Sequence, residues 1–187
     1  MAEIARIRCD IQKLRRLNTE QKSFIPHGTL DSCLTRETIK AALTYCKLEA
    51  STVPQVVRTI EDGAKKTFAI LILAKEPSSI IRFIEHDALL DRTLDSQIPF
   101  AKEDLQRIIP HAATDFDELQ WQFAAPLFSQ QLSHRWFRPD TRLPFLESAL
   151  IGSGGFGKVF RVKLPAGHHA FAGISPSHVS ATSCRES

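Results

Sequence analysis

Long apolar runs are absent from this sequence. The most apolar stretch, Phe68 to Ala74, is far shorter than the about 20 residues that a membrane-spanning helix requires. The first residues already carry charge, at Glu3 and Arg6, where a secretory signal needs an apolar segment. We therefore expect an intracellular protein, cytoplasmic or nuclear, with no membrane partner.

An excess of charge of one sign is also absent. The formal net charge is +3, from 24 Lys and Arg against 21 Asp and Glu. Binding to a nucleic-acid backbone needs a concentrated basic stripe. The nearest candidate is the group Arg6, Arg8, Lys13, Arg15 and Arg16, which Glu3 and Asp10 dilute. This pattern is more typical of a solvated helix face, and we expect no nucleic-acid partner.

Closely spaced cysteines are absent as well. The four cysteines are widely scattered and form no C-x-x-C motif, so we expect free thiols and no disulfide framework. A zinc site built from His168, His169, His178 and Cys184 fits no standard ligand spacing. We expect no bound metal at these residues.

What the sequence does contain, over its first part, is helical periodicity. Between Ala2 and about Asn18, apolar residues recur every three or four positions and form one stripe on a helix. This stripe could pack within the chain or against a helix of a partner protein. Thr35 is suited to an N-cap, Pro54 to a first helical turn and Gly63 to a helix end.

Three more segments continue this helical pattern. The run Lys65 to Lys75 is apolar on nearly every side, which fits a buried helix or a buried strand. Pro77 begins another helical stretch, and Ala101 to Ile109 forms one more before Pro110. No repeat with a period of 20 to 50 residues is present, so a solenoid is not indicated.

The later part of the chain changes character. Residues 116–145 combine aromatic residues with prolines and predict an irregular connector. Over 146–171, Leu146 to Ile151 and Val159 to Leu164 predict two strands joined by a glycine-rich turn. Residues 172–187 are small and polar and predict a disordered tail. The expected fold class is α+β, with a mainly helical region over 1–115 followed by the connector, the β-hairpin and the tail.

The glycine-rich turn is the most informative motif and the candidate site. It reads Ile151, Gly152, Ser153, Gly154, Gly155, Phe156, Gly157, Lys158, Val159. Its glycines at 152, 154 and 157 form G-x-G-x-x-G, a pattern that several nucleotide-binding folds share. A glycine-rich hairpin that binds no nucleotide also has this pattern.

The residues after the turn argue against two of the nucleotide-binding folds that share this motif. A dinucleotide-binding fold needs a helix after the third glycine and an acid about 20 residues later. Here a β-prone run follows, and Glu186 is the only acid after Glu147. A P-loop needs a Ser or Thr after Lys158 to bind magnesium, and Val159 has no hydroxyl.

The motif Ile151-Gly152-x-Gly154-x-x-Gly157-x-Val159 resembles the first two strands of a protein kinase catalytic domain. The chain also resembles a group of fungal kinase-domain proteins in its segments Gln120 to Phe128 and Leu143-Pro144-Phe145, and in His168-His169. The resemblance covers about Phe116 to Phe171. It implies a kinase N-lobe hairpin and a family that transfers phosphate from ATP to Ser or Thr. Residues 151–159 would then bind ATP, with Ile151 and Val159 against the adenine ring.

Most of the kinase machinery has no counterpart in this sequence. A kinase needs a third-strand lysine, a catalytic-loop acid and a magnesium-binding D-F-G motif. No lysine follows Lys163, and neither H-R-D nor D-F-G occurs. We expect a truncated, kinase-like protein that is catalytically inactive, with no catalytic residue and with ATP binding weak or lost. Magnesium would bind only if the missing lobe were present. The alternative function is a protein-interaction module built from the N-terminal helices, in which the kinase remnant has no function.

Overall fold

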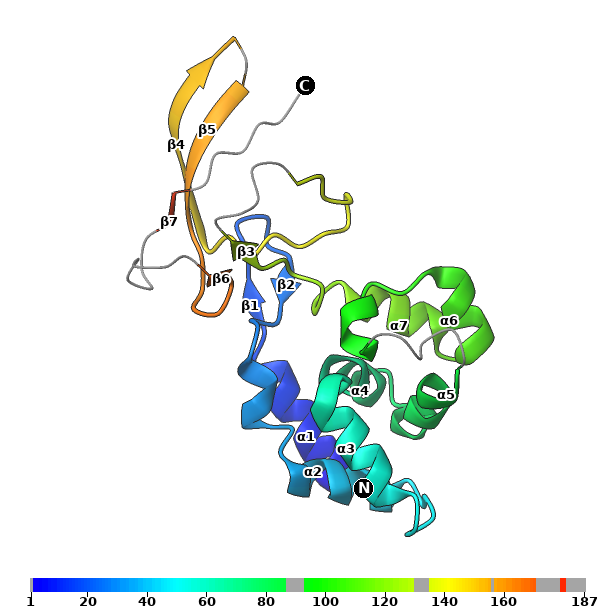
Figure 1. Cartoon of the computed structure of the whole chain (residues 1–187). Coiled ribbons are helices and arrows are strands. Elements are labelled where there is room, and N and C mark those ends of the chain that lie inside the picture. Colours follow the sequence, from blue (N-terminus) through cyan, green and yellow to red (C-terminus); the bar gives the residue numbers. More distant parts are fainter. Residues whose placement is uncertain (1, 87–92, 130–134, 156, 171–178, 181–187) are drawn as a thin grey trace. The chain divides into compact units, whose positions relative to one another are not determined.

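The computed structural model describes residues 2–86, 93–129, 135–155, 157–170 and 179–180. The chain divides into two compact units. The first comprises Met1–Leu14 and Thr29–Ala124, and the second comprises Arg15–Gly28 and Ala125–Ser187. The fold is mixed α and β, mainly helical, with small sheets (Figure 1).

The first unit is helical, and its helices are linked by short turns and 3₁₀ segments. The α-helices are α1 (Ala2–Lys13), α2 (Arg36–Tyr45), α3 (Val53–Gly63), α4 (Lys65–Leu73), α5 (Ile80–Glu85), α6 (Lys102–Ile108) and α7 (Ala113–Gln120). The 3₁₀ segments are η1 (Thr29–Ser32), η2 (Pro77–Ser79) and η4 (Leu94–Gln97). None of the helices in the described part of the chain has the length and apolar character needed to span a membrane.

Helix α4 is the centre of this unit. It packs against α1, α3, α5 and α7, as Figure 1 shows, and every residue from Thr67 to Leu73 is buried. A helix that is apolar on all sides needs neighbours on all sides. The structure therefore decides between the two predictions for Lys65 to Lys75 in favour of a helix.

An aromatic cluster closes the core near α5 and α7. The rings of Phe83 and Phe116 stack with centroids 5.3 Å apart, and Phe100 meets both edge-on at 5.3 and 5.8 Å. The buried side chain of Gln120 accepts a hydrogen bond from the Phe100 N–H at 2.7 Å and donates one to its carbonyl at 3.2 Å. These bonds satisfy a buried polar side chain and fix the loop before α6.

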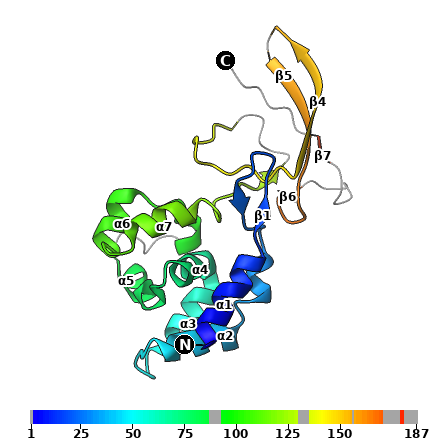
Figure 2. The ribbon, with the colours of Figure 1, turned by 180° about the vertical axis from the view of Figure 1, so that it is seen from behind.

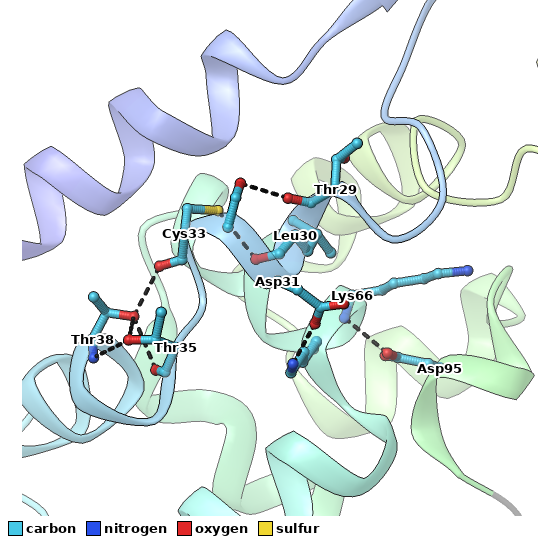
Figure 3. Close-up of polar contacts among 10 residues, drawn as sticks. Thr29, Leu30, Asp31, Cys33, Thr35, Thr38, Lys66 and Asp95 are labelled. Atoms are coloured by element: carbon cyan, nitrogen blue, oxygen red, sulfur yellow. Dashed lines mark hydrogen bonds and ion pairs between the residues drawn. The ribbon is translucent and has the colours of Figure 1, made fainter. Parts of the chain in front are cut away.

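The N-terminal ends of α2 and α4 are capped by side chains, as Figure 3 shows. Thr35 accepts a hydrogen bond from the Thr38 N–H at the start of α2, which confirms the predicted N-cap. At the start of α4, Asp95 accepts bonds from the N–H groups of Lys66 and Thr67, each at 2.9 Å. A carboxylate at a helix N-terminus satisfies free N–H groups and complements the helix dipole.

The predicted first helix ends earlier than expected. Helix α1 ends at Lys13, and Arg16–Leu17 form strand β1, which pairs antiparallel with β2 (Ser23–Phe24). The spacing of apolar residues continues through Leu17, but the pairing of β1 with β2 replaces the last helical turn. The apolar stripe itself packs within the chain, because Ile4, Ile7 and Ile11 are buried.

The second unit gathers the β1–β2 hairpin with the C-terminal strands. Asn18 donates from Nδ2 to the carbonyl of Leu143 at 3.0 Å, and the Thr19 N–H donates to the carbonyl of Phe145 at 2.8 Å. Strand β3 (Phe128–Ser129) pairs in parallel with β6 (His169–Ala170). The bonds of Asn18 and Thr19 join segments more than 100 residues apart in sequence, whereas the paired residues of β3 and β6 lie 41 positions apart.

His168 is the buried polar anchor of this unit. Its Nε2 accepts a hydrogen bond from the His27 N–H at 3.0 Å, and its Nδ1 lies 3.0 Å from the Pro126 carbonyl. Nδ1 must therefore carry the proton and donate it to that carbonyl. The ring also meets Phe24 edge-on with centroids 5.7 Å apart. His168 holds three separate segments together and is 1% exposed.

The longest strands form a hairpin, drawn in orange at the upper left of Figure 1 and seen from behind in Figure 2. Strand β4 (Glu147–Gly154) pairs antiparallel with β5 (Gly157–Lys163), as predicted for two strands in this region. A short strand, β7 (Val179–Ser180), pairs with the other edge of β5. The predicted tail, 172–187, lies outside the described residues apart from these two, which form β7.

Candidate functional site

The candidate site is the closed end of the β4–β5 hairpin. Its ladder runs from the pair Glu147 and Lys163 to the pair Leu150 and Phe160, and it resumes at Gly152 and Val159. Ile151 is the additional residue of a β-bulge between these pairs. A bulge sets two residues opposite one, so Ile151 and Gly152 face Val159 across the ladder.

The apolar side chains at this bulge are accessible. Ile151 is 52% exposed and Leu150 54% exposed, whereas Val159 is half-buried. Apolar residues on a strand normally pack against a second layer. The described residues provide no complete cover for Ile151, which leaves it available to contact an apolar ligand surface.

The turn itself is closed by the pair Gly154 and Gly157. Gly157 has φ of 139°, in the region that side chains rarely adopt, so the turn geometry requires glycine there. Phe156, predicted at the tip of the loop, lies outside the described residues. The other eight predicted site residues are described, and the hairpin brings them together around one turn.

The three remaining glycines of the loop are not required by the chain. None of Gly152, Gly154 and Gly155 has a positive φ. A Cβ added at Gly154 or Gly155 meets nothing within 4 Å, and one added at Gly152 only approaches Val159 at an ordinary 3.9 Å. Neither backbone conformation nor packing within the described chain explains these glycines. They leave the backbone bare on an open surface.

The charge at this end of the hairpin is positive. Lys158, which pairs with Ser153, is exposed, and its ammonium has no hydrogen bond or ion pair within the described ranges. The other end is neutralised by the ion pair between Lys163 and Glu147 at 2.6 Å. An exposed ammonium beside bare backbone is suited to a phosphate group, because the N–H groups of glycine can approach an anion closely.

Of the four residues considered as metal ligands, the structure describes His168 and His169. His168 is engaged by two backbone groups, as described above, and His178 and Cys184 lie outside the described residues. Within the ranges that the structure describes, no three His, Cys, Asp or Glu side chains are grouped as a metal would need. His168 is therefore a structural residue of the second unit.

Two arginines that the sequence did not single out come together in the second unit. Arg15 and Arg142 lie far apart in the chain, and Arg15 was grouped with the basic residues of a solvated helix face. The structure places both as half-buried side chains close enough for their charges to interact. Only the long-range pairing of residues 15–28 with the later chain creates this cluster, so no sequence pattern indicated it.

Comparisons with known proteins assign no family to this chain. No protein-family model matches it, and no curated protein or solved structure matches it either. The likeness to protein kinases therefore stays a prediction from the motif in residues 151–159.

Proposed function

We propose that the closed end of the β4–β5 hairpin binds the phosphate groups of a nucleotide, in the manner of the glycine-rich loop of protein kinases. The observation that supports this proposal best is the set of glycines at 152, 154 and 155. The chain itself does not need them, and glycine within a strand, as at Gly152 and Gly154, has a conformational cost. A ligand that must approach the backbone closely supplies a physical reason for their presence.

Different residues around the turn would contact the phosphates and the base of the nucleotide. The backbone at Gly154 and Gly155 would meet the phosphates, with the ammonium of Lys158 adding positive charge nearby. Ile151 and Val159, opposed across the bulge, would contact the adenine ring. Glycine-rich loops of kinases cover the phosphates of ATP in this way. ATP is therefore the nucleotide that we propose.

Phosphoryl transfer by these residues is not part of the proposal. Transfer needs a lysine and metal ions to neutralise the developing charge, and an acid to orient the attacking hydroxyl. The hairpin contributes none of the required acids. We propose weak nucleotide binding without catalysis, and a magnesium ion would reach the site only with the nucleotide.

A substitution at Gly154 tests the proposal. Replacing Gly154 with Val adds a side chain where the chain leaves open space, so the fold should be unaffected. The added side chain would nevertheless hold a phosphate away from the backbone. A titration of the full chain with a fluorescent ATP analogue should show saturable binding for the wild type and binding about tenfold weaker or more for Gly154→Val.

The matched control is Ala149→Val, in the same strand. Ala149 pairs with Arg161 and is exposed, so valine there makes a similar change away from the turn. This variant should bind like the wild type. Equal binding by the two variants, or no saturable binding by the wild type, would contradict the proposal.

The alternative, an interaction module in the helical unit, receives less support. Its most obvious contact surface was the apolar stripe of the first helix, and Ile7 and Ile11 of that stripe are 2% and 0% exposed. Arg8 of the same helix donates to the carbonyl of Ile72 in α4 at 3.0 Å. A partner helix would have to displace these contacts. A protein partner for the N-terminal helices stays a prediction that no described contact favours.

A further inference from the structure

The arginines at positions 15 and 142 form a positively charged cluster in the second unit. Arg142 donates from Nη1 to both the carbonyl and the hydroxyl of Ser23, the hydroxyl at 3.2 Å. Ser23 pairs with Leu17 across the β1–β2 ladder. Arg15 directly precedes β1, two residues before Leu17, and strand alternation continued by one residue puts it on the side of Leu17 and Ser23. Arg142 therefore joins Arg15 on one face of this hairpin.

One donor of the Arg15 side chain is buried without a partner among the described residues. Its Nε is shielded from solvent, and it has no hydrogen-bond partner in the part of the chain that the structure describes. A buried guanidinium N–H without a partner is costly, because it has lost its water and gained nothing in return. The group is thus placed as if a hydrogen-bond acceptor belonged beside it.

The two guanidinium groups also disturb each other. Burial and the positive charge of Arg15 lower the pKa of Arg142, in that order of size. Neither arginine forms an ion pair with a carboxylate among the described residues. Two acids of the same unit are engaged or open to solvent: Glu20 is paired with Lys22 at 3.0 Å, and Asp140 is exposed. Like charges that share a partly desolvated site repel each other unless an anion separates them.

We propose that Arg15 and Arg142 bind an oxyanion of the phosphate class on this face of the β1–β2 hairpin. The Nε of Arg15 would donate to one oxygen, and the free N–H groups of Arg142 would donate to another. Two guanidinium forks match the geometry of a phosphate, and their two charges match a group that carries about −1.5 to −2. This site is separate in its residues from the glycine-rich turn and does not depend on the nucleotide proposal.

The test compares the full chain in inorganic phosphate with the same chain in chloride at equal ionic strength. Phosphate should raise the melting temperature of the wild type. For Arg15→Ala this rise should disappear, and the variant in chloride should be at least as stable as the wild type, because the repulsion is removed. Broadening of the phosphorus NMR line should report the same binding directly, with affinity for Arg15→Ala reduced about tenfold or more.

Arg16→Ala is the matched control. Arg16→Ala removes the same charge as Arg15→Ala. Arg16 is adjacent and exposed, and it pairs with Phe24, so its side chain lies on the other face of the hairpin from Leu17 and Ser23. This variant should keep the full phosphate effect. An equal phosphate effect in Arg15→Ala and Arg16→Ala, or no effect in the wild type, would overturn the proposal. A loss of stability in Arg15→Ala in chloride would overturn it too.

A second arm distinguishes the source of the oxyanion. Phosphoserine replaces inorganic phosphate in the same measurements. Binding of both would show that the site accepts a phosphomonoester, as a phosphorylated partner would present. Binding of inorganic phosphate alone would show a site closed around the free ion. Either result supports the oxyanion site, and binding of neither contradicts it.

Discussion

The helical unit and the β4–β5 hairpin use apolar residues in opposite ways. In the helical unit, the central helix α4 is buried from Thr67 to Leu73. In the hairpin, β4 has no buried residue, and Val162 is the only buried residue of β5. The first region thus carries its own core. The second exposes Leu150 and Ile151 next to bare glycine backbone, an arrangement that suits contact with another molecule better than packing within the chain.

The largest expected difference between the two regions lies in large-to-small substitutions. Phe83→Ala removes the centre of the aromatic cluster and should lower the free energy of unfolding of the helical unit by about 3–5 kcal/mol. Leu150→Ala in the hairpin should cost less than about 1 kcal/mol, because the side chain is already half exposed. Urea denaturation followed by circular dichroism at the helical band measures the first. Hydrogen exchange measures the local stability of both regions. Equal losses of stability in Phe83→Ala and Leu150→Ala would contradict the difference between the two regions.

A second prediction compares one glycine from each region. Gly63, at the end of α3, has φ of 153°, and an added Cβ would lie 2.6 Å from Cβ and Cγ2 of Thr93. Gly63→Ala should therefore cost about 2 kcal/mol through strain and overpacking. Gly154→Ala should leave stability nearly unchanged, because its added Cβ meets nothing. Thermal melts of both variants check this, and a destabilised Gly154→Ala would mean that the chain itself requires that glycine.

A smaller effect is expected at the cap of α4. Asp95→Ala removes the acceptor for the N–H groups of Lys66 and Thr67 and should cost about 1 kcal/mol. Glu118→Ala, an exposed acid on α7, is the control and should change stability by less than about 0.5 kcal/mol. Chemical denaturation distinguishes the two. A cap contributes less than a core aromatic because it satisfies a few N–H groups without removing apolar surface from water.

Local signals in the sequence were sufficient for much of the helical unit. Thr35 caps α2, Pro54 lies in the first turn of α3, and Gly63 ends that helix, as predicted. Each of these signals acts within a few residues of itself, so sequence alone can display it. The hairpin was predicted for the same reason, because two β-prone runs flank a glycine-rich turn.

Long-range pairings could not be predicted in this way. Residues 15–28 join the later chain because Asn18 donates to the carbonyl of Leu143 in a distant segment. Asp95 caps the start of α4 although it lies 29 residues after Lys66, whose N–H group it accepts from. The cluster of Arg15 and Arg142 also depends on such contacts. Periodicity and turn chemistry say nothing about which distant segments meet.

The most direct test of the central claim is hydrogen exchange of the full chain with and without ATP. If the turn binds ATP, the amides in residues 151–159 should exchange more slowly when ATP is present, with little change in α4, which is already buried. If these amides exchange at the same rate with and without ATP, at ATP concentrations well above those used for the fluorescent analogue, the proposal of nucleotide binding is contradicted. The exposed hairpin would then be a glycine-rich turn without a nucleotide.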